Sequence, residues 1–385
     1  MNLKEKIIYL DNNSTTKVDE RVIQKMIPVL NELYANASSS HHFGKEINQL
    51  VKEARFEVCN LIGCEPSEII FTSGATEAIN LAIKGIALSA NFNRKKIVTI
   101  QTEHKAVLDT CKSLSELGFE IVYLPVNNDG TLDMELLSSK VDQETLLVAA
   151  MFVNNETGVI HDIKRISEIS HKQGALFFCD ATQGIGKVAF NVNHFDIDLL
   201  CFSGHKFHAP KGIGGLFLKS NLKNKISAQQ SGGGQEFGVR SGTLNTSGII
   251  GLGEACKISS NEMASNEIQI RKLRDLLEIE LLKIPGTFIN GNKNNRIYNT
   301  SNICFPNNDA NVIIGRLKNI AVSNGSACTS LIVEPSHVLS AMNLSEDLAL
   351  SAIRFSLSKY NTEEDVKNTV IQLKSVLINL PEPTL

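Results

Sequence analysis

A lysine lies between two histidines in the segment "CFSGHKFHAPKGIGG", residues 201–215. Lys206 follows an apolar run that predicts a buried strand, and a glycine-rich stretch typical of a hairpin comes after it. Desolvation at such a junction lowers the pKa of a lysine and supplies the neutral amine that attacks an aldehyde. The alternative is an ordinary turn lysine in solvent. We predict that Lys206 forms a covalent bond with a carbonyl compound.

The same segment permits a metal site with Cys201, His205 and His208 as ligands. On a strand that ends near Gly204, however, Cys201 would point into the core and the two histidines would diverge. None of the eight cysteines belongs to a C-x-x-C pair, so neither a zinc ribbon nor a thioredoxin-type pair is indicated. We therefore expect no intrinsic metal ion.

Pyridoxal phosphate is the cofactor that a lysine such as Lys206 would hold, and it needs further groups around it. A carboxylate must keep its ring nitrogen protonated. Asp180, which ends "ALFFCD", is the candidate, and a helix cap is its alternative role. Backbone N–H groups at a helix N-terminus bind phosphate, and Gly74, Ala75 and Thr76 lie at such a strand-to-helix turn.

Four more side chains fit the same cofactor and its substrate. Ser203 and His205 add hydrogen-bond donors for the phosphate. His104, in "QTEHKAV", follows a strand-like run and could stack on the ring and move protons, unless it is a polar turn residue. Arg354, in "SAIRFSLS", is a carboxylate binder by its chemistry; otherwise it is a strand arginine in an ion pair.

Cys328 differs from the cysteines in apolar runs such as "FFCDA", which behave as small hydrophobes. It lies in "NGSACTS", a stretch of small, turn-forming residues that predicts an exposed thiol on a loop able to move. Near cationic groups such a thiol ionises and becomes a nucleophile. The alternative is an incidental loop cysteine.

The elements that position these residues form an α/β pattern from about Glu68 to Ser220. Apolar strand-like runs such as "EIIFTSG", "TLLVAAMFV" and "DLLCFSG" alternate with helical stretches, which predicts a mostly parallel sheet covered by helices. Ligands bind such sheets outside the carboxyl ends of the strands. The residues that follow the predicted strands are 73–76, 101–104, 154–155, 180–183 and 203–206. We expect them to form one pocket.

The rest of the chain predicts a second, smaller unit. A long helix runs from Leu244 to the stop signal at Pro285 and Gly286. Strand-like "NTSNICFP" and "AIRFSLS" flank a helical "ANVIIGRLKN", and a final helix begins at Thr362. This pattern is typical of an α+β domain.

Composition excludes several function classes. The 38 basic and 41 acidic residues give a net charge of −3, which offers no electrostatic basis for a nucleic acid or an acidic membrane as partner. The longest apolar run, "LLVAAMFV", is too short to cross a bilayer, and the N-terminus lacks the apolar core of a secretory signal. We expect a cytoplasmic protein.

Eight motifs in order resemble those of the cysteine desulfurases of the IscS/NifS type. They are "FTSGATEAINLAIKG", "TEHKAVLDTC", "VNNETGV", "DATQGIGK", "SGHKFHAPKGIGGL", "GGGQEFGVRSGTLN", "SNGSACTS" and "IRFSLSKYNTEED". The resemblance extends from about Tyr9 to the final helix. It implies a homodimer with the fold-type I, class V aminotransferase architecture and a seven-stranded sheet. It also implies a large domain over 15–259, and a small domain of 1–14 and 260–385 with the cysteine loop at about 323–337.

The resemblance assigns a role to each site residue. Lys206 would hold the cofactor, Asp180 its ring nitrogen and Gln183 its ring hydroxyl, while His104 would stack on the ring. The phosphate would be bound by Ala75, Thr76, Ser203 and His205, with Thr243 from the other subunit. Asn155, which also contacts the cofactor, and Arg354 would orient the substrate carboxylate. Cys328 would accept the sulfur.

The activity that the resemblance implies is removal of sulfur from L-cysteine. Lys206 would move the Cα proton, the Cys328 thiolate would attack the substrate sulfur, and His104 or Lys206 would protonate the departing fragment. Alanine and a persulfide on Cys328 result, and the sulfur passes to acceptor proteins for iron–sulfur cluster assembly and other pathways. The chain ends at "INLPEPTL", without the tail usual in IscS proteins, so an IscU-like scaffold and other acceptors both remain candidates. Cys328 also remains a candidate transient ligand of an iron–sulfur cluster.

Four other functions are alternatives to a cysteine desulfurase. An aminotransferase needs no thiol such as that of Cys328. Only an activity assay would distinguish a selenocysteine lyase from a cysteine desulfurase. A non-catalytic scaffold would be expected to lack Lys206, Asp180 or Cys328. No G-x-G-x-x-G follows the first strand, which excludes an NAD-dependent dehydrogenase. The N-terminal "DNNSTT" departs from the family pattern, and we expect it to touch only the rim of the site.

Overall fold

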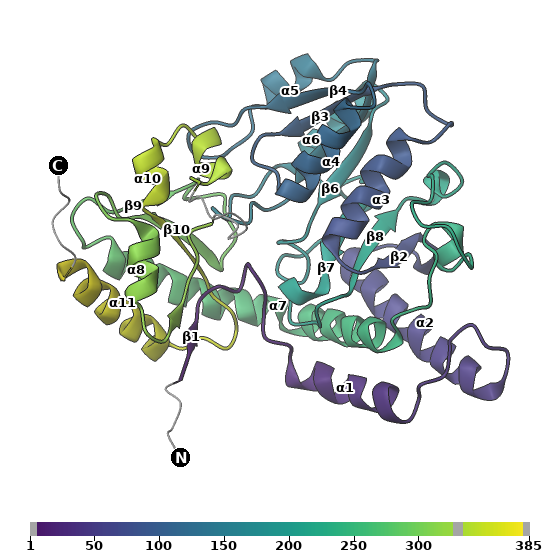
Figure 1. Ribbon diagram of the computed structural model, residues 1–385, viewed down its shortest axis with the longest axis horizontal. Helices are drawn as coiled ribbons and strands as arrows, with labels where there is room; N and C mark the ends of the chain where they lie inside the picture. The colour runs from purple at the N-terminus through teal and green to yellow at the C-terminus, as the bar shows by residue number, and fades with distance from the viewer. Residues whose placement is uncertain (1–5, 326–333, 380–385) are drawn as a thin grey trace.

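A long central helix joins two parts of the molecule in the computed structural model (Figure 1). The structure describes residues 6–325 and 334–379. The larger part contains a seven-stranded sheet, and the smaller part contains two short sheets. This arrangement confirms the predicted α/β class with a second, smaller α+β unit.

The seven-stranded sheet has the order β2-β8-β7-β6-β5-β3-β4. Its strands are β2 (Ile69–Thr72), β3 (Lys96–Ile100), β4 (Glu120–Leu124), β5 (Thr145–Met151), β6 (Leu176–Asp180), β7 (Leu199–Ser203) and β8 (Gly214–Leu218). Only β8 runs antiparallel to its neighbours. The sheet is therefore mostly parallel, as the continuous apolar runs predict.

The hairpin between β7 and β8 depends on a glycine. A Cβ atom on Gly214 would lie 2.5 Å from the carbonyl oxygen of Phe202 and 2.8 Å from the Cα atom of Gly74. Only a residue without a side chain lets β8 pass between β7 and the turn that follows β2. The "GIGG" of the sequence thus brings the Lys206 segment and the start of α3 together.

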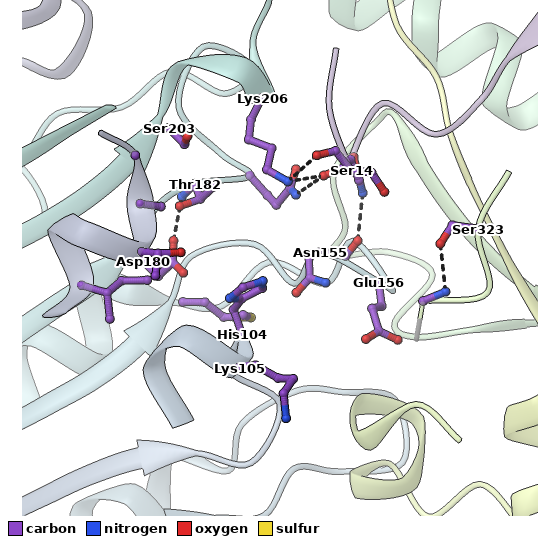
Figure 2. A pocket seen from close by; sticks show the side chains of 18 of the residues that line it. Ser14, His104, Lys105, Asn155, Glu156, Asp180, Thr182, Ser203, Lys206 and Ser323 are labelled. Atoms are coloured by element: carbon purple, nitrogen blue, oxygen red, sulfur yellow. Dashed lines mark hydrogen bonds between the residues drawn. The ribbon is translucent and has the colours of Figure 1, made fainter. Parts of the chain in front are cut away.

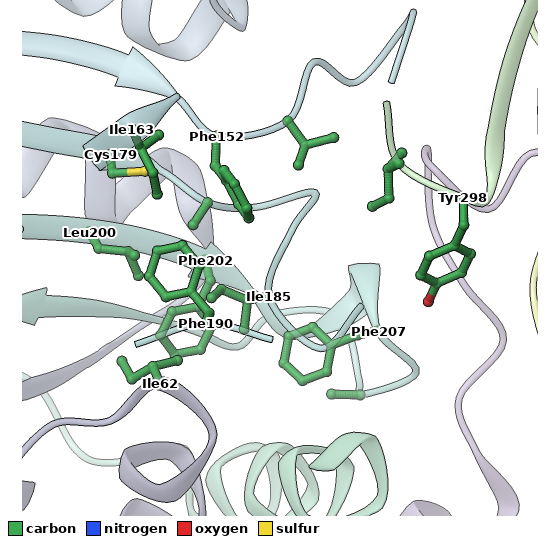
Figure 3. Packing of buried hydrophobic residues seen from close by; sticks show 14 of the residues in the cluster. Ile62, Phe152, Ile163, Cys179, Ile185, Phe190, Leu200, Phe202, Phe207 and Tyr298 are labelled. Atoms are coloured by element: carbon green, nitrogen blue, oxygen red, sulfur yellow. The ribbon is translucent and has the colours of Figure 1, made fainter. Parts of the chain in front are cut away.

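Helices cover both faces of the sheet. They are α1 (Glu20–Asn31), α2 (His42–Ile62), α3 (Ala75–Ala87), α4 (Lys105–Ser115), α5 (Met134–Lys140) and α6 (Ile163–Lys172), with short 3₁₀ turns at Pro66–Glu68, Gly204–Lys206, Ser220–Leu222 and Glu236–Gly238. Two apolar clusters fill the layers on either side. Figure 3 shows part of one, in which the rings of Phe152 and Phe190 meet edge to face at 5.2 Å. Each such buried ring stabilises the fold by about 2 kcal/mol.

The smaller part is built from segments far apart in the sequence. An antiparallel sheet joins β9 (Phe288–Asn290), β10 (Thr300–Cys304) and β12 (Ala352–Ser356), and β1 (Ile8–Tyr9) pairs in parallel with β11 (Ile320–Ala321). Its helices are α8 (Ala310–Arg316), α9 (His337–Ala341), α10 (Glu346–Leu350) and α11 (Glu363–Ile378). Thr362 and Asp365 form a capping box on α11, which confirms the predicted start of that helix.

Helix α7 (Thr246–Leu281) connects the two parts. It packs on α1 and α2 of the larger part and on α11 of the smaller part. We propose the domain boundary at residues 259–260, inside this helix. Among the described residues, no helix is both long enough and apolar enough to span a lipid bilayer.

The close approach at Gly214 generates the first prediction. We expect Gly214→Ala to lower the free energy of unfolding by about 2 kcal/mol, because its methyl group would overlap backbone atoms of two segments. Urea unfolding at one pH measures the change. Gly315→Ala is the matched control, since nothing lies within 4 Å of a Cβ atom there, and alanine favours the helix. Equal stability of Gly214→Ala and the wild type would contradict this account of the hairpin.

Candidate active site

A cavity of about 940 Å³ lies at the carboxyl ends of the parallel strands. The predicted site residues that line it are Ala75, Thr76, His104, Asn155, Asp180, Gln183, Ser203, His205, Lys206 and Arg354. The structure therefore brings ten predicted residues to one place, as the rule for strand ends predicts. Figure 2 labels His104, Asn155, Asp180, Ser203 and Lys206 among them, which come from different segments of the chain.

Lys206 ends the 3₁₀ turn after β7, and its amine faces this cavity. Its Nζ atom donates to the carbonyl oxygens of Asn13 at 2.6 Å and Ser14 at 2.9 Å. Burial, followed by the nearby Arg354 cation, lowers the pKa of Lys206 to about 8. The expected desolvation of this lysine is confirmed. Its amine is far more often neutral near physiological pH than that of a surface lysine.

Asp180 is the last residue of β6 and is buried at the floor of the cavity. Its Oδ1 atom accepts the backbone N–H of Thr182 at 3.0 Å and the thiol of Cys201 at 3.4 Å. Asp180 therefore also has part of its alternative role as a cap, because its carboxylate accepts an N–H group of the turn that follows β6. Its position in the cavity leaves it able to face a cationic ring nitrogen.

The N-terminus of α3, where the sequence predicts an anion site, lines the cavity. Ala75 and Thr76 occupy its first turn, and the Ser203 hydroxyl lies 3.4 Å from where a Cβ atom on Gly74 would be. His205 is next to them, and burial lowers its pKa to about 4. The ring is thus neutral near pH 7, and its Nδ1 atom lies 3.1 Å from the Thr15 hydroxyl. Such a set of donors suits a phosphate group.

His104 caps α4 as well as lining the cavity. Its Nδ1 atom accepts the backbone N–H of Ala106 at 3.1 Å, so the polar-turn alternative is also met. Desolvation by the cavity walls lowers the pKa of the ring. A neutral imidazole in this place can accept a proton.

Arg354 and Asn155, the two residues predicted to orient the substrate carboxylate, lie together in the cavity wall. The Arg354 guanidinium donates to the Asn155 carbonyl at 3.0 Å, to Asp11 Oδ1 at 2.8 Å and to Ser14 Oγ at 2.7 Å. Arg354 Nε and Asn155 Oδ1 are buried, and neither has a hydrogen-bond partner among residues 6–325 and 334–379. Buried polar atoms of this kind are normally satisfied. Two unsatisfied polar atoms at one place favour the binding of a polar ligand there.

The remaining predictions concern Thr243, Cys328 and the alternative metal site. Thr243 is exposed and does not line this cavity in its own chain. Cys328 lies outside the described residues. The ligands of the alternative metal site have separate partners, since His205 meets Thr15 and His208 Nδ1 meets the Lys17 carbonyl at 2.8 Å.

Asn13, Ser14 and Glu156 line the cavity but were not predicted as site residues from the sequence. Asn13 and Ser14 hold Lys206 and line the cavity wall, so the expectation that "DNNSTT" touches only the rim was wrong. Glu156, one residue past the recognised Asn154–Asn155 pair, also lines the cavity. The only signal was position: polar residues that continue a recognised motif, and a polar run after the first strand-like segment.

Comparisons with known proteins agree in one direction. The family model for aminotransferase class-V matches residues 8–369. A cysteine desulfurase IscS from Methylobacillus flagellatus is 46% identical over 380 residues, which are 97% of this chain and 93% of that protein. A solved NifS-like protein matches with a TM-score of 0.91 and 38% identity over 97% of this chain and all of its own. A structure of SspA in complex with cysteine matches with a TM-score of 0.82 and 32% identity, over 92% of this chain and 99% of its own.

The pKa of Lys206 generates a prediction for the cavity. We expect the rate at which the cofactor-free protein captures pyridoxal phosphate to rise with pH and to level off above about 8, because only the neutral amine attacks an aldehyde. Growth of the visible absorption band between pH 6 and 9.5 measures the rate. Lys206→Ala should lose this component entirely. A rate that is still rising steeply at pH 9.5 would instead indicate a solvated lysine.

Proposed function

This chain belongs to the aminotransferase class-V family and, within it, to the cysteine desulfurases, and from this premise we propose how its residues remove sulfur from L-cysteine. The observation that carries the proposal is the convergence of the Lys206 amine, the Asp180 carboxylate and the Arg354 guanidinium on one cavity. An amine, an anion and a bidentate cation are the groups that cofactor capture, ring protonation and substrate binding require.

Enzymes of this family depend on pyridoxal phosphate, and the residues present fit that group. Lys206 would hold its aldehyde carbon, and Asp180 would face its ring nitrogen. The first turn of α3, with Ser203 and His205, would hold its phosphate. When bound, the cofactor takes up the electrons that remain after the substrate loses its Cα proton.

The two partly unsatisfied groups would orient the substrate. Arg354 would offer its Nε–H, which has no partner in the described chain, to the carboxylate of L-cysteine, and the same guanidinium donates to the Asn155 carbonyl. Asp11 and Ser14 hold the guanidinium in place, so it is ordered before substrate arrives. Lys206, whose amine is largely neutral above pH 8, would take the Cα proton.

Sulfur transfer then needs a nucleophile, which we assign to Cys328. Its thiolate forms an S–S bond to the substrate sulfur as the Cβ–S bond breaks. The electron pair of that bond stays on the substrate carbon, which His104 or Lys206 protonates. Alanine and a persulfide on Cys328 result. The substrate carbon is reduced and the Cys328 sulfur is oxidised, so no external oxidant is required.

We further propose a homodimer and a protein acceptor for the sulfur. Thr243 is exposed on its own chain, which suits a residue that serves the cavity of the other subunit. Exposed aromatic residues, Tyr34, Phe43, Phe56 and Phe237, supply apolar surface for such contact. An IscU-like scaffold or another sulfur acceptor would receive the persulfide for iron–sulfur cluster assembly or a related pathway.

Turnover of L-cysteine tests this function. The cofactor-loaded protein should release alanine and, under reductant, sulfide in equal amounts. Cys328→Ser should lower the rate at least about a hundredfold, since no other thiol is assigned to the attack. Lys206→Ala should lose both the covalently bound cofactor and turnover. Undiminished sulfide release by Cys328→Ser would refute the persulfide step.

The role of Arg354 makes a separate prediction. Arg354→Lys cannot form the paired hydrogen bonds of a guanidinium, so we expect kcat/KM for L-cysteine to fall about tenfold to a hundredfold, mostly through KM. Steady-state kinetics at several L-cysteine concentrations separates KM from kcat. Arg316→Lys, at an exposed site, is the matched control. A normal KM in Arg354→Lys would remove Arg354 from substrate binding.

A further inference from the structure

Glu156 lies in the turn that follows β5, directly after Asn155. The side-chain oxygen of Asn154 accepts the backbone N–H groups of Glu156 and Thr157 at 3.0 and 2.9 Å, which fixes this turn. Glu156 is only 2% exposed, yet it lines the cavity next to Asn155 (Figure 2). Two segments from the smaller part meet its carboxyl group.

The first contact comes from Ser336. Its hydroxyl group donates to Glu156 Oε2 at 2.5 Å. The same oxygen of Ser336 accepts the N–H of Leu339 at 3.2 Å, as the N-cap of α9. Glu156 is therefore bonded directly to the residue at which α9 begins.

The second contact comes from Gly325. A Cβ atom on Gly325 would lie 2.5 Å from Glu156 Oε2, so the backbone of this residue packs on the carboxyl group. Gly325 has a φ of +82°, which favours glycine, and its N–H donates to Ser323 Oγ at 3.2 Å. The backbone conformation thus favours glycine here, and Glu156 Oε2 lies where a Cβ atom would be.

These two contacts bracket Cys328 in the sequence. Gly325 precedes Cys328 by three positions, and Ser336 follows it by eight. Residues 326–333 lie outside the described part of the chain. One carboxyl group therefore touches the chain on both sides of the segment that carries the proposed nucleophile.

Burial makes this carboxyl group expensive to keep. Desolvation raises the pKa of Glu156 to about 7, against the Ser336 hydrogen bond and the Arg354 cation, which lower it. A turn that only had to fold would be more stable with a side chain that needs no desolvation. The carboxyl group is thus better explained by what it holds.

We propose that Glu156 is a positioning residue for Cys328. It bonds Ser336 and packs on Gly325, one residue on each side of the segment that carries Cys328, and sulfur transfer to Cys328 depends on this link. This inference rests on the proposed function, in which the S–S bond forms as the C–S bond of L-cysteine breaks. Glu156 itself forms and breaks no covalent bond; it acts through Ser336 and Gly325.

The test follows two signals in the cofactor-loaded enzyme. The change in visible absorption on adding L-cysteine reports substrate engagement with the cofactor, and mass spectrometry of rapidly quenched samples reports the persulfide on Cys328. We expect Glu156→Ala and Ser336→Ala each to slow persulfide formation about tenfold or more. The absorption change should stay within about twofold of wild type, because no hydrogen bond in the described chain joins Glu156 or Ser336 to Lys206, Asp180 or Arg354. Ser336→Thr keeps the hydroxyl and should keep most of the rate.

A double variant tests whether the two residues act together. Glu156→Ala combined with Ser336→Ala should be no slower than either single variant, since each removes the same link. Ser345→Ala is the matched control, because Ser345 is an exposed N-cap of α10 without a side-chain cap bond. If Glu156→Ala does not fold, the comparison of Ser336→Ala with Ser336→Thr decides.

Three outcomes would overturn the proposal. They are persulfide rates within about twofold of wild type in the Ala variants, equal losses in both signals, and additive losses in the double variant. Failure of the proposed function looks different, because the unaltered enzyme would then form no persulfide at all.

Discussion

The structure depends on keeping one amine out of water between the larger and the smaller part of the molecule. Lys206 Nζ is held by two backbone carbonyls, those of Asn13 and Ser14, and no salt bridge to it occurs within residues 6–325 and 334–379. Carbonyl groups satisfy the N–H donors without stabilising the charge as a carboxylate would. The amine therefore stays hydrogen-bonded, while its pKa remains low enough for attack on an aldehyde.

The N-terminal segment makes that arrangement possible because it crosses between the two parts. β1 pairs with β11 in the smaller part, and Asn13 then bonds the Asn155 carbonyl and the Thr300 hydroxyl. Asp11 and Ser14 hold Arg354 from the same stretch. One short segment thus sets the distance between the amine and the guanidinium. Movement of one part of the molecule against the other would displace the amine and the guanidinium at the same time.

The sequence predicts those parts of the site that follow a local rule. Lys206, Asp180 and His104 each come directly after a buried strand, and the carboxyl ends of parallel strands meet at one edge. Asn13 and Glu156 follow no such rule, because their importance comes from segments about 190 and 180 positions away. Pairings of that range depend on packing that no local pattern encodes. Thr243 rests on the family resemblance, and Cys328 rests on that resemblance and on the small, turn-forming residues around it; both roles are proposals.

The charge distribution explains why the cavity suits its ligands. Burial, followed by the Lys206 and Arg354 cations, lowers the pKa of Lys187 to about 7, and burial, followed by Arg354, lowers the pKa of Lys206. The Lys187 amine donates to Gln183 Oε1 at 2.9 Å, and it has no carboxylate partner in the described chain. A phosphate dianion and a substrate carboxylate would offset this repulsion. Ligands that bind only the folded state also stabilise it, so the same charges that weaken the empty site favour the loaded one.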